Sequence, residues 1–241
     1  MSMTSPFARA LAAAVMLSAA PTMAAPVHHA LESAAGVRLH NVTAEPATLA
    51  GRKGLRVAVS PEAGSRPGMT PEALAQLETL AVIEGTEFQS GVIEAEIAGA
   101  VAPGAAEGAR GFVGLAFRVQ KDMKTYDAFY LRPTNGRADD QERRNHATQY
   151  VSHPEWPWFR LRKETPGRYE SYVDLVPGAW TKIRIEVHGA RARLYVHDQE
   201  QPALIVNDVK SGPDAKGAVA LWIGPGTVAH FRKLRVEPAS R

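Results

Sequence analysis

Residues 130–172 carry the densest set of side chains that could bind or transform a ligand. Two histidines in this segment, His146 and His153, can exchange protons near neutral pH, because the unperturbed imidazole pKa is about 6.5. Such a histidine can act as a general base toward a C–H bond that a neighbouring carbonyl has acidified. We therefore treat His146 and His153 as the candidate catalytic residues.

Arginines, amides and aromatic residues surround the two histidines. Guanidinium groups can grip carboxylates or paired hydroxyls, and flat rings can stack on sugar rings. The candidate substrate-binding residues are Tyr130, Arg132, Asn135, Arg137, Arg143, Arg144, Asn145, Gln149, Tyr150, Trp158 and Arg162. Gly136 would permit a turn that brings Arg137 back toward Arg132.

The same segment has a purely structural interpretation, in which arginines and carboxylates tie a long loop to a sheet. Ion-pair networks that hold a structure look the same in a sequence as those that hold a ligand. Apolar periodicity is nearly absent from residues 130–172, and a long irregular excursion in a compact domain is often functional. The segment as a whole therefore favours function, while both interpretations stay open for any single arginine.

Alternation of apolar and polar residues dominates the rest of the chain. Residues 181–187 and 192–196 alternate on either side of Gly189, which predicts a hairpin with one buried face. Other strands are expected at 37–42, 55–60, 80–83, 93–97, 113–119, 126–132, 203–206, 218–223 and 228–236.

One short helix is expected from Thr70 to Leu80, because Pro71 suits the first helical position and leucines follow at helical spacing. Many short strands at close spacing predict an all-β antiparallel sandwich or jelly roll. The long insertion at 130–172 would then be the functional part of it.

The N-terminus has the pattern of a secretory signal peptide. Arg9 is the only charge before Glu32, an apolar run at 10–17 follows it, and Thr22-Met23-Ala24 supplies small residues for cleavage. The apolar run is too short to cross a bilayer, which takes about 20 residues. We expect a signal peptide at 1–24, one domain at 25–241, and export to the periplasm or the extracellular space.

Composition excludes several classes of function. The 241 residues include no cysteine, which removes thiol nucleophiles and Cys-ligated metals. The formal charge is only +3, with acids interspersed among the cations, so no nucleic-acid partner is expected. We also expect no membrane span and no cofactor. Oxygen ligands for Ca²⁺ could come from Asn135, Asp139 and Asp140, so a Ca²⁺ site is possible, but their spacing does not support one. The oligomeric state is left open.

Several runs resemble one superfamily. Residues 85–97 are similar to the F-x-x-G-x-I-E-x-E/D strand of concanavalin A-like lectin and glucanase domains. Further runs that resemble strands of these domains are 111–118, 180–187 with 192–196, and 217–224 with 230–236. The resemblance covers roughly residues 37–237 and implies a concanavalin A-like β-sandwich, that is, a jelly roll.

Within that superfamily the chain most resembles the 3-keto-disaccharide hydrolase-like, or family 16-like, domains. The acid–x–acid–x–x–acid strand of true family 16 glucanases is not reproduced at Glu94 and Glu96, so no catalytic residue carries over one for one. The resemblance implies a carbohydrate partner, and the arginine-rich segment favours an anionic one.

Two functions are compatible with these residues. The first is an exported enzyme that cleaves the glycosidic bond of a 3-keto or anionic glycoside, with His146 or His153 as the base. The enolate oxygen would then be held by Arg132, Arg137, Arg143 or Arg144. The alternative is a lectin-like carbohydrate-binding module without catalysis. A third interpretation, a sandwich used for protein contacts, lacks the exposed apolar stripe it would need.

Overall fold

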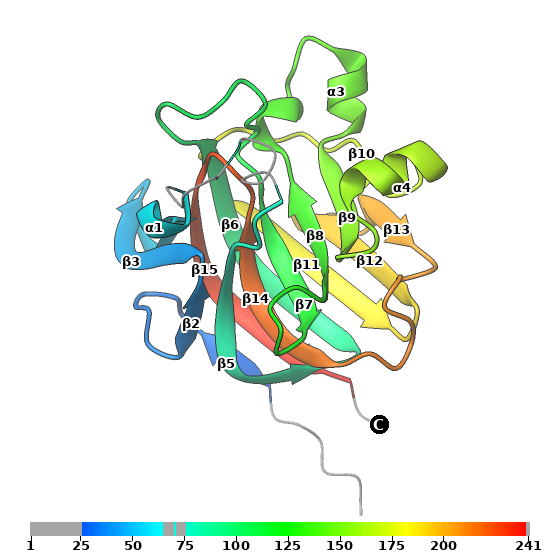
Figure 1. Ribbon diagram of the computed structural model, residues 1–241, viewed down its shortest axis with the longest axis horizontal. Helices are drawn as coiled ribbons and strands as arrows, with labels where there is room; N and C mark the ends of the chain where they lie inside the picture. The colour runs from blue at the N-terminus through cyan, green and yellow to red at the C-terminus, as the bar shows by residue number, and fades with distance from the viewer. Residues whose placement is uncertain (1–25, 65–69, 71–75, 240–241) are drawn as a thin grey trace, which may run out of the picture.

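The computed structural model describes residues 26–64, 70 and 76–239. Within them the chain forms two antiparallel sheets packed face to face (Figure 1). The order of strands in sheet A is β13-β12-β11-β6-β15-β4-β3, and β1 also pairs with β15. The order in sheet B is β10-β9-β8-β7-β14-β5-β2. Neighbours in each sheet are often distant in sequence, as in a jelly roll, so the sandwich is an all-β fold as the sequence predicts.

The bounds of the elements are as follows. Sheet A contains β1 (Val27–His29), β3 (Val42–Leu49), β4 (Arg52–Val59), β6 (Gly91–Val101), β11 (Thr181–His188), β12 (Arg191–Val196), β13 (Leu204–Val206) and β15 (Thr227–Pro238). Sheet B contains β2 (Val37–His40), β5 (Leu80–Phe88), β7 (Val113–Val119), β8 (Tyr126–Leu131), β9 (Thr148–His153), β10 (Glu170–Ser171) and β14 (Gly217–Ile223). The short helices are α1 (Pro61–Gly64), η1 (Pro133–Asn135), α3 (Gln141–Asn145) and α4 (Trp158–Glu164).

The core lies between the two sheets. Strand β11 alternates buried and more exposed residues, so Ile183 and Ile185 face inward, as the period of two predicts. Across from them, Phe117 of sheet B stacks on Phe129 with ring centroids 6.3 Å apart. The predicted hairpin is confirmed, because β11 pairs with β12 from Ile183↔Val196 to His188↔Arg191.

Sheet B differs from sheet A because several of its strands are buried on both faces. Every residue of β7 and β8 is buried, so residues 126–131 show no clear alternation of apolar and polar types in the sequence. The outer face of β9 is covered by α4, whose Leu161 is buried. Apolar and polar residues alternate along a strand only where one face of the sheet is exposed to water.

Two expectations about secondary structure need correction. Residues 130–172 are not an irregular excursion: they contain η1, α3, α4 and the two strands β9 and β10 at one edge of sheet B (Figure 1). The helix expected from Thr70 to Leu80 falls partly on residues 71–75, which lie outside the described residues. Residues 76–79 are not helical, and Leu80 begins β5, where it is fully buried.

The signal peptide predicted at 1–24 also lies outside the described residues. Among the described residues, no helix has the length and apolar character needed to cross a membrane.

Candidate functional site

A buried carboxylate organises several of the predicted binding residues. Glu170 of β10 accepts a hydrogen bond at 3.2 Å from Nη1 of Arg132, which follows the end of β8. Arg162 of α4 donates to the same carboxylate from Nε at 2.9 Å and also from Nη2. We call the set Tyr130, Arg132, His146, Gln149, Arg162 and Glu170 the Glu170 cluster. Two guanidinium groups against one carboxylate leave this cluster with a net positive charge.

Arg132 is held in place by the sheet around it. Its Nη2 donates to Oε1 of Gln149 at 2.9 Å and to the Tyr130 hydroxyl at 3.1 Å, and its Nη1 also donates to the carbonyl of His146 at 2.9 Å. Its side chain is 6% exposed, so these bonds replace the water that the charge loses. Arg132 therefore has a structural role, which is one of the two interpretations that the sequence left open.

His146, at the C-terminal cap of α3, joins the cluster from the side. Its Nε2 lies 3.5 Å from Oε2 of Glu170, and its ring is largely buried. Burial lowers the pKa of His146 below 6.5; Glu170 acts in the opposite direction, and Arg162 and Arg132 lower the pKa further. The imidazole is therefore neutral at pH 7 and can accept a proton.

Arg162 links the buried cluster to the surface. Burial by itself would lower the pKa of Arg162, but the hydrogen bonds to Glu170 raise it above its usual value. A third of its side chain is exposed, and its guanidinium lies over the ring of Trp158, 4.7 Å from the centroid. Trp158 begins α4 and is 43% exposed. This arginine and this ring can therefore both reach a ligand.

A second arginine–aromatic pair lies on the other side of β10. Arg144 of α3 donates to the Tyr172 hydroxyl at 2.9 Å and lies 4.9 Å from its ring centroid. Tyr172 is 41% exposed and follows β10 directly. Figure 1 shows α3 and α4 flanking β10, so both pairs border the strand that carries Glu170. We call Trp158, Arg162, Arg144 and Tyr172 the exposed rim.

His153 lies at the opposite end of β9 from His146. An extended strand rises about 3.3 Å per residue, which puts the two histidines on the order of 20 Å apart. One active site cannot use both. The ring of His153 stacks on the ring of Tyr126, with the two centroids 4.9 Å apart. Burial lowers the pKa of His153 to about 4.

Tyr150 faces the wrong side of sheet B for a ligand site shared with its neighbour Gln149. Its ring packs on Phe129 in the core, and its hydroxyl donates to Asp127 at 2.7 Å and accepts from the backbone N–H of Lys210 at 2.8 Å. It is 0% exposed. Because side chains alternate along a strand, Gln149 and Tyr150 cannot both face a ligand.

The remaining predicted residues lie around α3 and η1. Arg137 is exposed and forms a two-point ion pair with Asp174 at 2.7 Å, so it does not turn back to Arg132. Gly136 has a right-handed backbone and is required for a different reason: a Cβ there would lie 2.3 Å from the backbone nitrogen of Leu175. Asn135 is buried and donates to the His146 carbonyl at 3.2 Å.

Asn145 and Arg143 also belong to α3. The Asn145 side chain is exposed and accepts a hydrogen bond from Gln141 at 2.7 Å. The backbone N–H of Arg143 donates to Oδ1 of Asp140, which caps the helix. In the part of the chain that the structure describes, no group of three or more His, Asp or Glu side chains is placed to hold a metal.

Sequence reasoning missed Glu170, Tyr172 and Trp222. Glu170 lies in a strand of two residues, which is too short to show a period. Trp222 of β14 stacks on Tyr130 at 4.6 Å and donates to the Tyr126 hydroxyl at 3.2 Å. These contacts form a row across the outer face of sheet B, from His153 at one end to Arg132 at the other.

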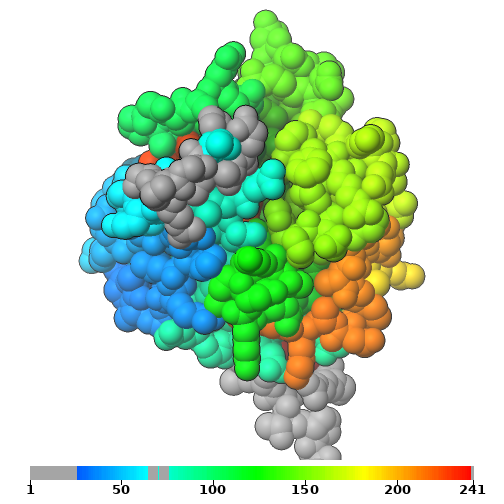
Figure 2. Space-filling model, viewed as in Figure 1, coloured from blue at the N-terminus to red at the C-terminus, as the bar shows by residue number. Residues whose placement is uncertain are grey.

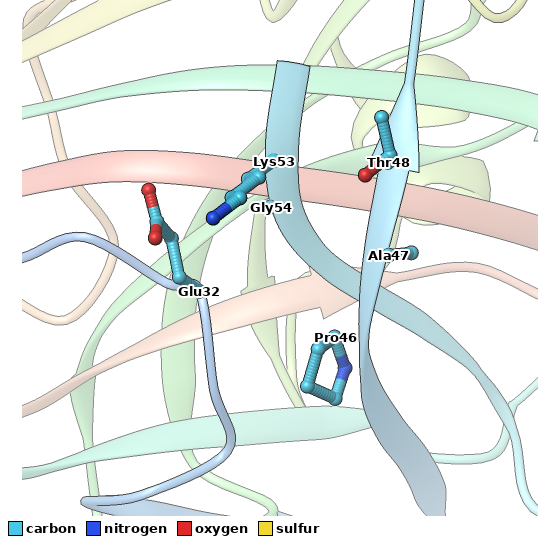
Figure 3. Close-up of a pocket in the computed structure, with 6 residues that line it drawn as sticks. All are labelled: Glu32, Pro46, Ala47, Thr48, Lys53 and Gly54. Carbon is cyan, nitrogen blue, oxygen red and sulfur yellow. The ribbon is translucent and has the colours of Figure 1, made fainter. Parts of the chain in front are cut away.

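A separate hollow of about 390 Å³ lies at the edge of sheet A, between the β3–β4 hairpin and the chain near Glu32. Figure 3 shows the Lys53 ammonium and the Glu32 carboxylate pointing toward one another across it, with Pro46, Ala47 and Thr48 on the far side. None of the predicted site residues lines this hollow.

Comparison with known proteins supports the fold. No protein-family model matches the sequence, and no curated protein matches it. Among solved structures, the chain is similar to a carbohydrate binding module, CBM66, from Bacillus subtilis, with a TM-score of 0.50 and 12% identity over 81% of this chain and 94% of that chain.

Two further solved structures are similar to the chain. One is a protein of unknown function with a galectin-like fold from Bacillus subtilis, with a TM-score of 0.49 and 14% identity over 92% of this chain and 100% of that one. The other is a β-glucanase from Bacillus licheniformis, with a TM-score of 0.44 and 11% identity over 90% and 100%.

At such identities, structural similarity shows the fold and not the activity. The chain has a jelly-roll β-sandwich fold, as its sequence predicts. A similar fold is found in a carbohydrate binding module.

Proposed function

We propose that the protein is an exported carbohydrate-binding protein that holds an anionic sugar at the exposed rim of the Glu170 cluster. The observation that carries the proposal is the placement of Arg162, whose guanidinium is fixed by Glu170 on one side and lies beside the exposed ring of Trp158 on the other. A fixed cation beside a flat ring offers both contacts that a carboxylated sugar needs.

Charge favours an anion over a neutral ligand at this position. Glu170 neutralises only one of the two guanidinium groups that bind it, and the neutral imidazole of His146 adds no negative charge. Arg144 brings a further cation to the rim. A carboxylate that binds here gains charge-assisted hydrogen bonds, which are about twice as strong as neutral ones.

The rim is also rigid, which favours binding. Arg162 loses little freedom when a ligand binds, because Glu170 already fixes its Nε and Nη2. Trp158 and Tyr172 have few rotatable bonds and bury large areas for a small entropic cost. The neighbouring CBM66 module is a carbohydrate-binding protein by its name, which agrees with this use of the fold.

A titration of matched sugars tests the proposal. Glucuronate and galacturonate should bind the full mature chain, and the corresponding neutral glucose and galactose should bind this site at least tenfold more weakly, since about 1.4 kcal/mol separates each factor of ten. Arg162→Gln and Arg144→Gln should each weaken the binding of uronates. Arg137→Gln, which breaks an exposed ion pair outside the cluster, is the matched control. Equal binding of uronates by wild type and Arg162→Gln would refute the proposal.

A second function is supported by the contact between His146 and Glu170. A carboxylate within 3.5 Å of an imidazole can orient the ring and stabilise its protonated form. In a 3-keto glycoside, His146 would take the proton from the carbon beside the carbonyl and form an enolate. Collapse of the enolate would expel the leaving group from the anomeric carbon as an alkoxide, and the protonated His146 would return the proton to it to give an alcohol. Water would then add to the resulting double bond.

The site offers less support for an ordinary two-carboxylate glycosidase. That mechanism needs a protonated acid as well as an ionised carboxylate, about 5 to 10 Å apart. Glu170 accepts hydrogen bonds from two guanidinium groups, and the other acid near His146, Glu142, is exposed on α3. Binding, with proton abstraction as the second candidate, is therefore the function that this geometry supports best.

A further inference from the structure

We infer that the protein has a second ligand site, at the His153 end of sheet B, that takes an uncharged sugar ring. A cavity of about 600 Å³ lies there, within the range of about 300–1,000 Å³ that small-molecule sites occupy. Its walls come from the β7–β8 connection, the turn that follows β9, and the loop at 208–216. In Figure 2 these three segments (green, yellow-green and orange) meet on the face turned to the viewer.

The cations that line this cavity are already paired. Lys210 donates to Asp208 at 2.8 Å, and the exposed Lys216 pairs with Glu87 at 3.0 Å. The buried guanidinium of Arg118 donates to the carbonyls of Gln89, Gly189 and Gly212, and it also lies 3.8 Å from Asp127. These pairings leave no free guanidinium or ammonium group for a carboxylate, in contrast to the exposed rim.

His153 is a polar residue in the wall whose ring nitrogens the protein leaves uncommitted. Its imidazole forms no hydrogen bond or ion pair with any residue that the structure describes, although it is largely buried and lines the cavity. Its ring is held flat against Tyr126, with an interplanar angle of 19°. A neutral imidazole offers one donor and one acceptor, which matches a sugar hydroxyl.

Other parts of the wall suit the same ligand. Gln120 uses its Nε2 for the carbonyls of Arg118 and Lys216, at 2.8 Å each, so its Oε1 remains as an acceptor. Pro154 and Ala215 supply apolar surface. A few placed polar groups within a mostly apolar wall are typical of small-molecule sites. The cavity therefore fits a neutral monosaccharide, whose hydroxyls reach the polar groups while its C–H face meets the apolar ones.

This inference does not depend on the proposed function, because the two sites share no residue. The Glu170 cluster lies at the start of β9, where Gln149 is the second residue of the strand, whereas His153 is the last residue of the same strand. The two sites can therefore fail separately: a variant at one end should leave binding at the other end unchanged.

Saturation-transfer difference NMR on the full mature chain tests the second site with six neutral probes: glucose, galactose, mannose, fructose, xylose and arabinose. We expect at least one of them to bind. His153→Phe keeps the ring but removes both nitrogens, and it should weaken binding about tenfold, as the loss of one or two hydrogen bonds implies. Ala215→Phe fills the cavity without removing a hydrogen bond of the protein and should abolish the signal.

Two controls keep the test decisive. Arg162→Gln should leave the neutral-sugar signal unchanged, and Ala215→Phe should still bind glucuronate if the exposed rim is a separate site. Retained uronate binding also shows that the Ala215→Phe variant is folded. If the Ala215→Phe variant does not fold, His153→Phe supplies an independent test. Absence of binding by all six sugars, or binding that neither His153→Phe nor Ala215→Phe weakens, would overturn the inference.

Discussion

The guanidinium of Arg132 and the carboxylate of Glu170 lie 3.2 Å apart although 38 residues separate them in the chain. Both side chains are almost fully buried, at 6% and 2% exposure. The pair joins the end of β8 to the edge strand β10, and α4 adds Arg162 to the same carboxylate. The contact between Arg132 and Glu170 makes the arginine-rich segment part of the sandwich. The second arginine that binds Glu170, Arg162, is partly exposed at the surface.

Arg132→Ala should lower the free energy of unfolding. Removing one partner of a buried ion pair costs about 3–5 kcal/mol, and because Arg162 still neutralises Glu170 we expect about 2–3 kcal/mol here. Chemical denaturation measures the loss. Arg137→Ala, at an exposed ion pair with Asp174, should change stability little. Similar stability of the two variants would contradict the structural role of Arg132.

Trp158→Ala should weaken uronate binding by roughly tenfold with little change in melting temperature, since stacked aromatic rings contribute on the order of 1 kcal/mol and this ring is exposed. Isothermal titration calorimetry gives the affinity. Phe159→Ala, at the next aromatic residue, which is also exposed, is the matched control because no arginine stacks on it among the contacts described. A larger effect of Phe159→Ala than of Trp158→Ala would place the ligand elsewhere.

His146→Gln should separate binding from chemistry. Glutamine can form hydrogen bonds but cannot accept the proton, so binding of the sugar should persist while any turnover of 3-keto glycosides is lost. Because burial lowers the pKa of His146, the rate in wild type should stay level as the pH falls to about 6.5 and decline only below it. The assay is release of the leaving group across pH. Turnover that survives His146→Gln would exclude this histidine as the base.

His153 should make the folded state sensitive to acid. Its pKa is about 4 in the folded protein and about 6.5 when unfolded, so between these values the unfolded chain binds more protons. Stability should therefore fall as the pH drops from 6.5 to 4, with a contribution from this residue on the order of 2–3 kcal/mol. His153→Phe retains the stacking on Tyr126 but does not titrate.

The measurement for this prediction is the melting temperature of wild type and His153→Phe from pH 7.5 to 4. The variant should lose less stability than wild type across this interval, while both remain sensitive to the protonation of carboxylates. Parallel curves for the two proteins would show that the imidazole is not protonated on unfolding.

Tyr150→Phe should reduce stability without affecting a ligand. The substitution removes the hydroxyl that donates to Asp127 and accepts from the Lys210 backbone, which leaves a buried acceptor and a buried donor short of partners. The expected cost is about 1–3 kcal/mol. Tyr172→Phe, at the exposed rim, should show the reverse: nearly unchanged stability and weaker uronate binding, since Arg144 loses its hydroxyl partner.

The fold was largely predictable because its signals are local. Alternation at 181–196 is a property of consecutive side chains, and it persists because one face of sheet A is exposed to water. The jelly roll followed from such strands and from their resemblance to a known superfamily. Strand β9 gave no such signal, because the residues from Thr148 to Ser152 are buried whether polar or apolar.

The candidate site was predictable only in its composition. The sequence by itself determined that arginines, histidines and aromatic residues crowd into 130–172, and that Gln149 and Tyr150 must face opposite sides of any strand they share. Tertiary structure decided the rest. Arg132 forms a buried ion pair that holds the segment to the sheet, while Arg162 reaches solvent, and the extended strand β9 separates His146 from His153. The physical reason is that burial, and therefore pKa and access, depends on which distant elements cover a residue, and Glu170 meets its arginines only when three such elements pack together.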